Sequence, residues 1–356
     1  MRHNPVCFDK DAIPMMPGWT KRVLSILTLI VAYVVTPNLA ATTPASAQNP
    51  PDTYSVQWEN DRIANTDRHY TNGFRLSWVS GARDGDPMWV KDVLEALYPF
   101  ASLRQGRVGA AFGQSIFTPE DTVTSGLVTD DRPYAGWLYG AISVHAETKR
   151  APASTATDIL DTVELNLGIV GPWALGRQVQ NGVHDLINVG RSNGWGHQLD
   201  NEPGLMLIGE RRWRPAPWKL FGLEAGAIPH IGGSVGNVMT FASAGAILRF
   251  GQNLDVDYGP PLIRPSLSGL AAVEKRSDFA WYVFAGVQAR GVAHDIFLDG
   301  NTFSSSHSVE KKRLVGDAQV GVAFIFKGVR LAVTQILRTR EFEGQRQADR
   351  FGAISL

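Results

Sequence analysis

A series of strand-like segments, recurring from residue 53 to the C-terminus, constrains the fold more than any other feature of this sequence. In residues 74–80 and 138–145, large apolar residues alternate with small or polar ones, as a strand with one apolar and one polar face requires. The sequence predicts about twelve such strands. Their ranges are 53–59, 73–80, 107–115, 136–147, 161–170, 204–213, 219–229, 238–249, 281–291, 312–326, 329–338 and 346–356.

The lengths and aromatic residues of these segments indicate a membrane barrel. Many are about ten residues long, which is the length of a tilted strand that crosses a bilayer. Aromatic residues gather near their ends, as in the interfacial girdles of outer-membrane barrels. They are Trp58, Trp78, Trp89, Trp137, Trp213, Trp218, Trp281, Phe324 and Phe326.

We therefore predict an all-β fold, an antiparallel transmembrane β-barrel of about twelve strands with short helices in its loops, in the bacterial outer membrane. A secreted soluble β-sandwich would share the alternation, but its strands would usually be shorter and more closely spaced. The last residue, Leu356, departs from the barrel pattern, because such barrels usually end on an aromatic residue.

The N-terminus has the order of a secretory signal: Lys21 and Arg22, apolar residues 23–35, and small residues ending at Ala47. About 13 apolar residues are too few for a spanning helix, which needs roughly 20. We expect a signal peptide over 1–47 and one barrel domain over 48–356.

Cleavage after Ala47 would remove the only cysteine, Cys7, and would therefore exclude disulfides and thiolate-bound metals. It would also remove four of the 34 Lys and Arg residues and two of the 34 Asp and Glu residues, leaving a net charge near −2. That balance gives no reason to expect nucleic acid as a partner.

Two segments have helical rather than strand periodicity. Residues 89–97 read as a short amphipathic helix beside the membrane or over the barrel mouth. In residues 177–188, an apolar stripe of Val179, Val183, Leu186 and Ile187 lies opposite a polar stripe of Arg177, Gln180, His184 and Asn188. We expect this second helix to present His184 rather than bury it.

Two clusters carry candidate chemistry. Glu59-Asn60-Asp61 ends the first predicted strand, and residues 67–73 open the second, so carboxylate, amide and hydroxyl oxygens converge as a hard cation such as Ca²⁺ prefers. An ordinary polar turn explains the same composition. His184 is a candidate general base, because a histidine exchanges protons near neutral pH, although a solvated or structural histidine is the alternative.

The stretch 190–194 fits the G-x-S-x-G pattern of serine hydrolases. That pattern works only at a strained strand-to-helix turn of an α/β sheet, which this sequence does not predict. We therefore do not assign Ser192 as a nucleophile.

Several blocks together resemble the lipid A deacylase (LpxR-type) outer-membrane proteins, in the family's order from about Tyr54 to the C-terminus. The blocks are Glu59-Asn60-Asp61, Tyr70-Thr71-Asn72-Gly73, Asp131-Arg132-Pro133-Tyr134-Ala135-Gly136, Gly171-Pro172, Val179-Gln180-Asn181-Gly182-Val183-His184 and the stretch from Gly194 to Pro203.

The resemblance implies a twelve-stranded barrel that cleaves the ester-linked 3′-acyloxyacyl chain of lipid A in a Ca²⁺-dependent reaction. It implies that Asn60 and Asp61 belong to the metal and oxyanion region, that Thr71 lines the same pocket, and that His184 activates water. We expect Gln180, Asp131 and Arg132 to support the site, and lipid A, lipopolysaccharide and outer-membrane lipid to be the partners.

This sequence departs from the family pattern at two points. A lysine expected shortly after the third strand is absent from residues 117–123, and Gly190 stands where a glutamate is expected about six residues beyond the histidine. Asp185, Asp200 and Glu202 are the candidates to replace that glutamate.

Besides the esterase, two functions stay open: a lipid-binding or structural barrel without turnover, and a small-solute pore. A pore should have a lumen lined by charge. We expect small residues to face inward here, so a narrow or side-chain-filled interior is favoured over a pore. They are Gly140, Ser143, Ala225, Gly245 and Ala285.

Overall fold

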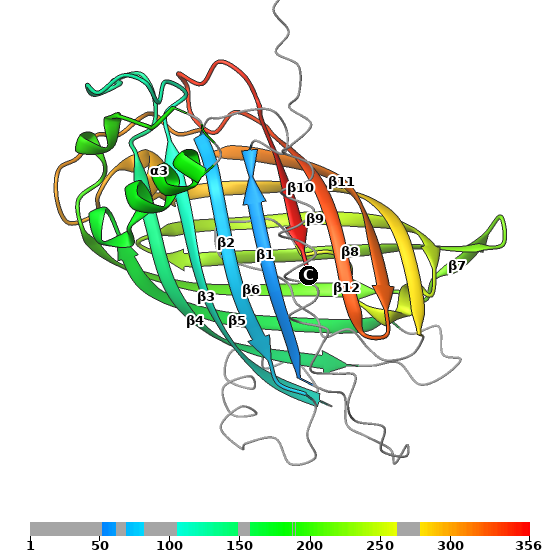
Figure 1. The fold of residues 1–356 in the computed structure, drawn as a ribbon. Helices are drawn as coiled ribbons and strands as arrows, with labels where there is room; N and C mark the ends of the chain where they lie inside the picture. Colours follow the sequence, from blue (N-terminus) through cyan, green and yellow to red (C-terminus); the bar gives the residue numbers. More distant parts are fainter. Residues whose placement is uncertain are drawn as a thin grey trace, which may run out of the picture. The chain divides into compact units, whose positions relative to one another are not determined.

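Strand pairing continues around the whole sheet and closes it. The computed structural model describes residues 52–61, 69–81, 105–148, 157–186, 188, 190–261 and 278–356. Within them, 13 strands form one antiparallel sheet in the order β6-β5-β4-β3-β2-β1-β13-β12-β11-β10-β9-β8-β7, and β6 also pairs with β8 (Figure 1). The closing pair joins residues 206–212 to 230–236, so twelve long strands form the barrel wall.

The strands are β1 (Thr53–Asn60), β2 (His69–Val79), β3 (Gln105–Thr118), β4 (Ala135–Thr148), β5 (Asp158–Val170), β6 (Glu202–Arg214), β7 (Trp218–Leu220), β8 (Leu223–Gly236), β9 (Met239–Gln252), β10 (Phe279–Asp295), β11 (Leu314–Phe326), β12 (Val329–Arg338) and β13 (Asp349–Ser355). The helices are η3 (Pro172–Ala174), α3 (Gly176–Leu186), η4 (Gly194–His197), η5 (Leu254–Val256) and α4 (Ile296–Asp299). None of the described helices is long and apolar enough to cross a membrane.

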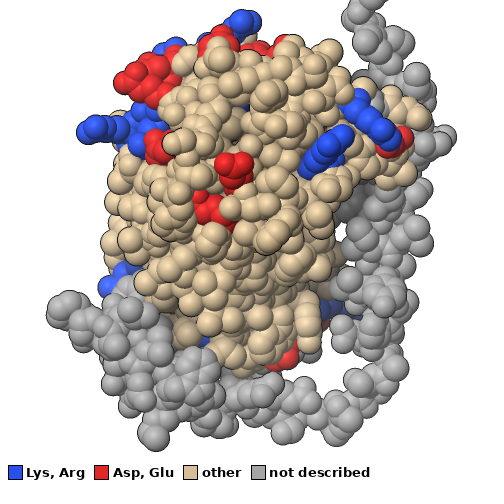
Figure 2. All heavy atoms as spheres, turned by 90° about the vertical axis from the view of Figure 1, so that its left-hand side faces the viewer, with Lys and Arg blue, Asp and Glu red and all other residues tan. Residues whose placement is uncertain are grey.

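Strict alternation gives the barrel an apolar outer face. In β10 every second residue from Ala280 to Val292 is buried, and the residues between them are mostly exposed. Large apolar side chains are exposed on many strands, among them Phe112, Ile142 and Leu167. Figure 2 shows most of the charged side chains in the upper part of the view and few on the described surface below it. An apolar band of this kind suits contact with lipid tails.

The interior holds charged side chains in pairs. Arg75 lies 2.7 Å from Glu164, and Arg338 lies 2.7 Å from Asp317. Pairing is required because an unpaired buried charge is very costly. Of the small residues expected inside, Gly140 and Ala285 are exposed on the outer face instead, so that part of the prediction is wrong. The interior is filled, but by large charged and aromatic side chains.

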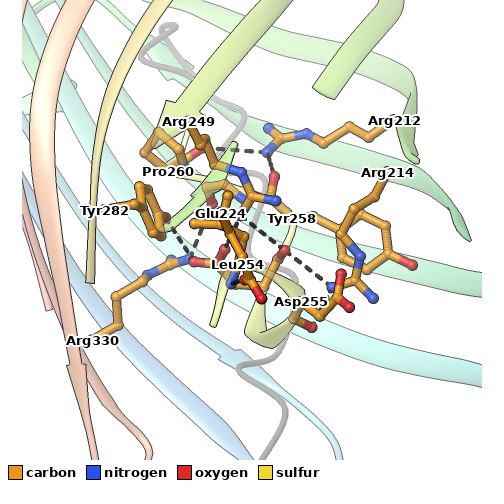
Figure 3. A network of polar contacts seen from close by, with 12 residues as sticks. Arg212, Arg214, Glu224, Arg249, Leu254, Asp255, Tyr258, Pro260, Tyr282 and Arg330 are labelled. Atoms are coloured by element: carbon orange, nitrogen blue, oxygen red, sulfur yellow. Dashed lines mark hydrogen bonds and ion pairs between the residues drawn. The ribbon is translucent and has the colours of Figure 1, made fainter. Parts of the chain in front are cut away.

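A segment after β9 folds into the end of the barrel where β1 begins, which we call the lower end. Leu254 and Val256 of η5 are fully buried in a core cluster with wall residues. Asp257 follows, and its carboxylate receives Arg249 at 2.8 Å and Arg330 at 3.2 Å. Figure 3 shows Arg249, Arg330 and Tyr282 converging on this segment from the wall.

The opposite, upper end is filled by α4. Asp295 caps this short helix by accepting a hydrogen bond from the Phe297 amide at 3.0 Å. The Phe297 ring stacks on Phe117 of β3 with centroids 4.0 Å apart, and both belong to a core cluster with Tyr70 and Phe351. Side chains therefore fill both ends of the lumen, an arrangement that does not favour the pore.

The predicted fold class is confirmed, and the predicted strands correspond to the barrel strands within a few residues, with one difference. The segment expected at 219–229 is divided: β7 is a three-residue strand paired only with β8, because the turn at Phe221 and Gly222, both with positive φ, lies within it. The predicted signal at 1–47 and the helix at 89–97 lie outside the described residues.

Candidate functional site

Polar side chains lie on the outer face of the wall at its upper end. Alternation along β1 directs Asn60 outward, and its Nδ2 donates to the Thr71 carbonyl at 3.1 Å. The Thr71 hydroxyl lies 2.8 Å from the Thr118 hydroxyl at the end of β3. Asn60, Thr71 and Thr118 are all buried, at 8%, 4% and 0% exposure. We call these three residues the wall patch.

The loop between β5 and β6 lies against the same outer face. Gln114, outward on β3, donates to the Ala174 carbonyl at 2.6 Å. At Gly136, outward on β4, an added Cβ would lie 3.0 Å from the Ala174 Cβ and 3.2 Å from the Gly176 nitrogen. Glycine at 136 thus allows the start of α3 to approach the wall closely, and α3 packs over the upper ends of β3 and β4 (Figure 1).

The buried face of α3 differs in part from the prediction, since half of the polar stripe is buried while Arg177 and Asn188 are exposed. Gln180 and His184 are buried, at 2% and 3% exposure, whereas Leu186 is 69% exposed. The expectation that His184 is presented to solvent is therefore wrong. Val179 does pack inward, beside Ile116 of β3 and Trp195 of η4. The physical reason is the surroundings: outside the barrel an apolar residue such as Leu186 can face lipid, so Gln180 and His184 can turn toward the wall.

A backbone carbonyl holds the His184 ring. Its Nδ1 lies 2.7 Å from the carbonyl oxygen of Gly190. A carbonyl only accepts, so Nδ1 carries the proton and donates. In the neutral ring Nε2 then has the lone pair, which is the state that a general base needs. Of the candidates to replace the family's glutamate, Asp185 pairs with Arg191, Asp200 with Ser304 and Glu202 with Asn237 and Asn301.

The amide of Gln180 is buried and, among the described residues, has no hydrogen-bond partner at either Oε1 or Nε2. One helical turn separates Gln180 from His184, so the two side chains share the face of α3 that meets the wall. Buried polar atoms without partners are rare and call for an explanation such as a bound molecule. This amide is therefore a candidate to contact a ligand between α3 and the wall patch.

Ser192 does not have the setting of a serine nucleophile. It lies in the loop between α3 and η4, where its backbone NH donates to Asn181 Oδ1 at 3.0 Å. The His184 ring nitrogen described above bonds to Gly190 rather than to this hydroxyl. The surroundings contain no strand-to-helix elbow, in agreement with the rejection of the G-x-S-x-G pattern.

Asp61 follows Asn60 and is buried at 1% exposure. Its carboxylate and the Asn60 amide are hard oxygen donors, which suit Ca²⁺ in kind. In the described part of the chain, no three His, Cys, Asp or Glu side chains gather as a metal site. A cation held here would therefore depend on one carboxylate, amide and main-chain oxygens, water and the ligand itself.

Asp131 and Arg132 form a separate cluster at the barrel mouth. The Asp131 carboxylate lies 3.5 Å from His69 Nε2 and accepts the amides of Glu120 and Arg132, both at 2.7 Å. Burial raises the pKa of Asp131, but the hydrogen bond and charge of His69 and the two backbone amides outweigh it and hold this pKa below its usual value.

Arg132 lies on the lumen side of the wall. Its guanidinium lies over the Phe117 and Phe342 rings and 3.4 Å from Glu341. Since Phe117 packs inward in the core, Arg132 faces away from α3. The structure therefore joins Asn60 with Thr71 by a hydrogen bond, buries Gln180 and His184 on one face of α3, and places Asp131 and Arg132 together in the neighbouring mouth.

Sequence reasoning missed Thr118, and it named Gly190 only as the position where the expected glutamate is absent. Strand alternation does not identify Thr118 as a neighbour of Thr71, because the register pairs Thr118 with His69 and shifts between Tyr70 and Asn72. No residue-type signal could have identified Gly190, because it acts through its carbonyl.

A closed antiparallel barrel with an apolar outer band and a charged, paired interior defines an outer-membrane β-barrel protein. The model of the family described as outer membrane protein LpxR matches residues 27–356. The chain therefore belongs to the LpxR family and lies in the bacterial outer membrane, which confirms the resemblance read from the sequence.

One solved structure has the same fold. LpxR from Salmonella typhimurium matches with a TM-score of 0.67 at 19% identity, over 86% of this chain and 99% of that one. The translocator domain of the autotransporter NalP from Neisseria meningitidis matches with a TM-score of 0.34 at 8% identity, over 94% and 96%, which is too low to support an argument. No curated protein sequence matches the chain.

Proposed function

We propose that this protein is a lipid A esterase of the 3′-O-deacylase kind, which hydrolyses an ester-linked acyl chain of lipopolysaccharide in the outer membrane. Family membership supports the class of activity. The observation that carries the proposal is the position of His184, buried between α3 and the outer wall with Nδ1 bound to the Gly190 carbonyl. A base on the lipid side of the wall can reach an ester while the acyl chains remain in the membrane.

In the proposed reaction, His184 Nε2 takes a proton from water as the water oxygen attacks the ester carbonyl carbon. The tetrahedral intermediate then collapses, the bond to the sugar-side oxygen breaks, and the proton on His184 passes to that oxygen. The products are a free fatty acid and a lipid A hydroxyl. No acyl-enzyme forms, so no serine nucleophile is needed.

Stabilisation of the oxyanion is assigned to the wall side of the site. Asn60 and Asp61 would hold a Ca²⁺ ion, which when bound polarises the ester carbonyl and offsets the charge that develops on its oxygen. Thr71 lines the same pocket. The buried amide of Gln180 would orient the substrate or the water from the helix side. A site with a single carboxylate is expected to bind Ca²⁺ weakly, on the order of 10⁻⁴–10⁻³ M as in extracellular modules.

The mouth cluster supports the site indirectly in this proposal. Asp131 connects the chain before β4 to His69 at the start of β2, two residues before Thr71. Arg132 fixes the same segment against Phe117 and Phe342. Both therefore stabilise the loops and strand ends around the wall patch, and neither is assigned a contact with the ester.

A second candidate is a barrel of the same fold that binds lipid or has a structural role without turnover. It is favoured by one observation: residues 117–123 contain no lysine, and Thr118, in that stretch, bonds to Thr71 in the wall patch. The positively charged lysine side chain that the family pattern places there is therefore absent from this stretch.

Mass spectrometry of lipid A separates the two candidates. Lipid A from cells with the wild-type protein should lose the mass of one ester-linked acyl chain relative to lipid A from cells without it. Cells with the His184→Gln variant should retain the full mass. Unchanged lipid A in the presence of folded wild-type protein and Ca²⁺ would favour the non-catalytic barrel.

A further inference from the structure

The loop that follows α3 is anchored to the helix by hydrogen bonds close to His184. Asn181 Oδ1 accepts from the Ser192 amide at 3.0 Å, and Asn181 Nδ2 donates to the Ser192 carbonyl at 3.3 Å. One amide side chain thus holds both backbone groups of one residue. Two residues earlier, Gly190 provides the carbonyl that accepts from His184 Nδ1 at 2.7 Å. His184 and Asn181, whose side chain holds the loop, are therefore only three residues apart on the helix.

A second contact involves Arg191, the residue between Gly190 and Ser192. Arg191 donates from Nε and Nη2 to the two carboxylate oxygens of Asp185, at 2.8 and 2.6 Å. Both side chains are exposed, and an exposed pair of this kind contributes little to stability. The buried connection through Asn181 is the one expected to fix the loop.

We propose that Asn181 is a positioning residue for His184: by holding the backbone of Ser192, it fixes the Gly190 carbonyl that keeps the proton on His184 Nδ1. The proposal rests on the proposed role of His184 as general base. The family pattern places a glutamate at position 190. In this chain the neutral carbonyl of Gly190 would take the place of that carboxylate.

The hydrogen bonds between Asn181 and Ser192 matter because the group at position 190 is a backbone carbonyl and not a carboxylate. A carboxylate attracts an Nδ1 proton through its charge and can adjust through a flexible side chain. A carbonyl has no net charge and moves only with the backbone, so its hydrogen bond to the ring depends on the position of the loop. An Nε2-protonated ring would have no lone pair directed at water, and such a ring cannot act as the base.

Asparagine fits this role because it both donates and accepts. Asn181→Asp keeps the acceptor for the Ser192 amide but loses the donor to the Ser192 carbonyl. Asn181→Ala loses both. If Asn181 acts through this loop, the two variants should be graded, with aspartate the less affected.

The test measures the tautomer and the activity separately. Nitrogen NMR of the ¹⁵N-histidine-labelled barrel in detergent, with the His184 signals identified by their loss in His184→Gln, should show the Nδ1-protonated ring in the wild type. Asn181→Ala should shift His184 to a mixture of tautomers and lower kcat by roughly tenfold or more with KM little changed, since general-base catalysis provides factors of about 10² or more.

Asn193→Ala is the matched control. Asn193 lies in the same loop, and its side chain donates to the Val123 carbonyl at 3.0 Å rather than to residues 190–192. This variant should keep both the wild-type tautomer and the wild-type kcat.

The outcomes are distinguishable from failure of the proposed function. A wild type that hydrolyses no lipid A defeats the esterase proposal, while the tautomer comparison still tests Asn181. A His184 tautomer that is the same in Asn181→Ala and the wild type overturns the inference, even if activity falls. If Asn181→Ala does not fold into a heat-modifiable barrel, Asn181→Asp provides the same comparison, and an unchanged tautomer there overturns it.

Discussion

The hydroxyl groups of Thr71 and Thr118 lie 2.8 Å apart on neighbouring strands, on the lipid-facing side of the barrel wall, and both are buried. Outward positions elsewhere on these strands carry exposed apolar side chains such as Phe74 and Phe112. Polar groups on this face are stable only where something other than lipid covers them. Here α3 lies over the neighbouring wall with Gln180 and His184 buried.

The first prediction separates the two hydrolytic mechanisms. His184→Gln should leave a folded barrel whose deacylase activity is reduced by roughly 10²-fold or more, the usual scale for losing a general base. Ser192→Ala should change little, because Ser192 is a loop residue. Release of fatty acid from purified lipid A measures the activity of both variants. A fluorophosphonate probe should not label the wild-type protein. An inactive Ser192→Ala with a covalent adduct in the wild type would reverse the assignment.

The second prediction concerns the cation. Chelation with EDTA should abolish deacylation, and added Ca²⁺ should restore it. Asp61→Asn should raise the Ca²⁺ concentration for half-maximal activity by roughly tenfold or more, because the charge of the ligands sets Ca²⁺ affinity. A titration of activity against free Ca²⁺ measures this shift. Full activity of the wild type in excess EDTA would remove the cation from the mechanism.

The third prediction tests the close approach of α3 to the wall. Gly136→Val should displace the start of α3, because even one added carbon would lie 3.0 Å from the Ala174 Cβ, and activity should fall by at least tenfold with the barrel intact. Gly140→Val is the control, since a Cβ at this exposed position on the same strand meets nothing within 4 Å. Heat-modifiable migration in SDS gels checks the barrel. Equal activity of the two variants would contradict the placement of α3.

The fourth prediction concerns pH. The pKa of Asp131 is lower in the folded protein than its usual value near 4, because the His69 contact and two backbone amides outweigh burial. A depressed carboxyl pKa stabilises the fold above the unfolded-state pKa, and this stabilisation is lost as pH falls below about 4 through the folded pKa. Asp131→Asn should therefore lower the unfolding temperature in detergent at pH 7, and its difference from the wild type should shrink as the pH is lowered below about 4. A constant difference across that range would show that the charge of Asp131 is not responsible.

The fifth prediction concerns the filled lumen. The wild type should not conduct ions in planar bilayers, because η5 fills the lower end and α4 fills the upper end. Asp257→Ala leaves Arg249 and Arg330 without their shared carboxylate. Breaking a buried pair in this way typically costs about 3–5 kcal/mol, so the unfolding transition should move to lower temperature or denaturant. Steady conductance by the wild type would restore the pore as a candidate function.

Much of the fold could be predicted from the sequence because the pattern that encodes it is local. Alternation within 138–145 or 281–291 marks a strand with two different faces, whatever lies on either side. The same local pattern could not identify which face is inside. Gly140 and Ala285 were expected inside and are exposed, because in this barrel the small residues can lie outward and the large charged ones inward, in pairs such as Arg75 with Glu164.

The candidate site divides in the same way. The sequence by itself determined which side chains we propose for the chemistry: His184 as a base, Asn60 and Asp61 as oxygen donors, and Gln180 one turn from the histidine. Tertiary structure alone decided that α3 buries Gln180 and His184 and that a Gly190 carbonyl holds the His184 ring. The physical reason is that both depend on surroundings which no residue type encodes: an exterior at which Leu186 can remain exposed, and a backbone group brought to the ring by the return of the loop.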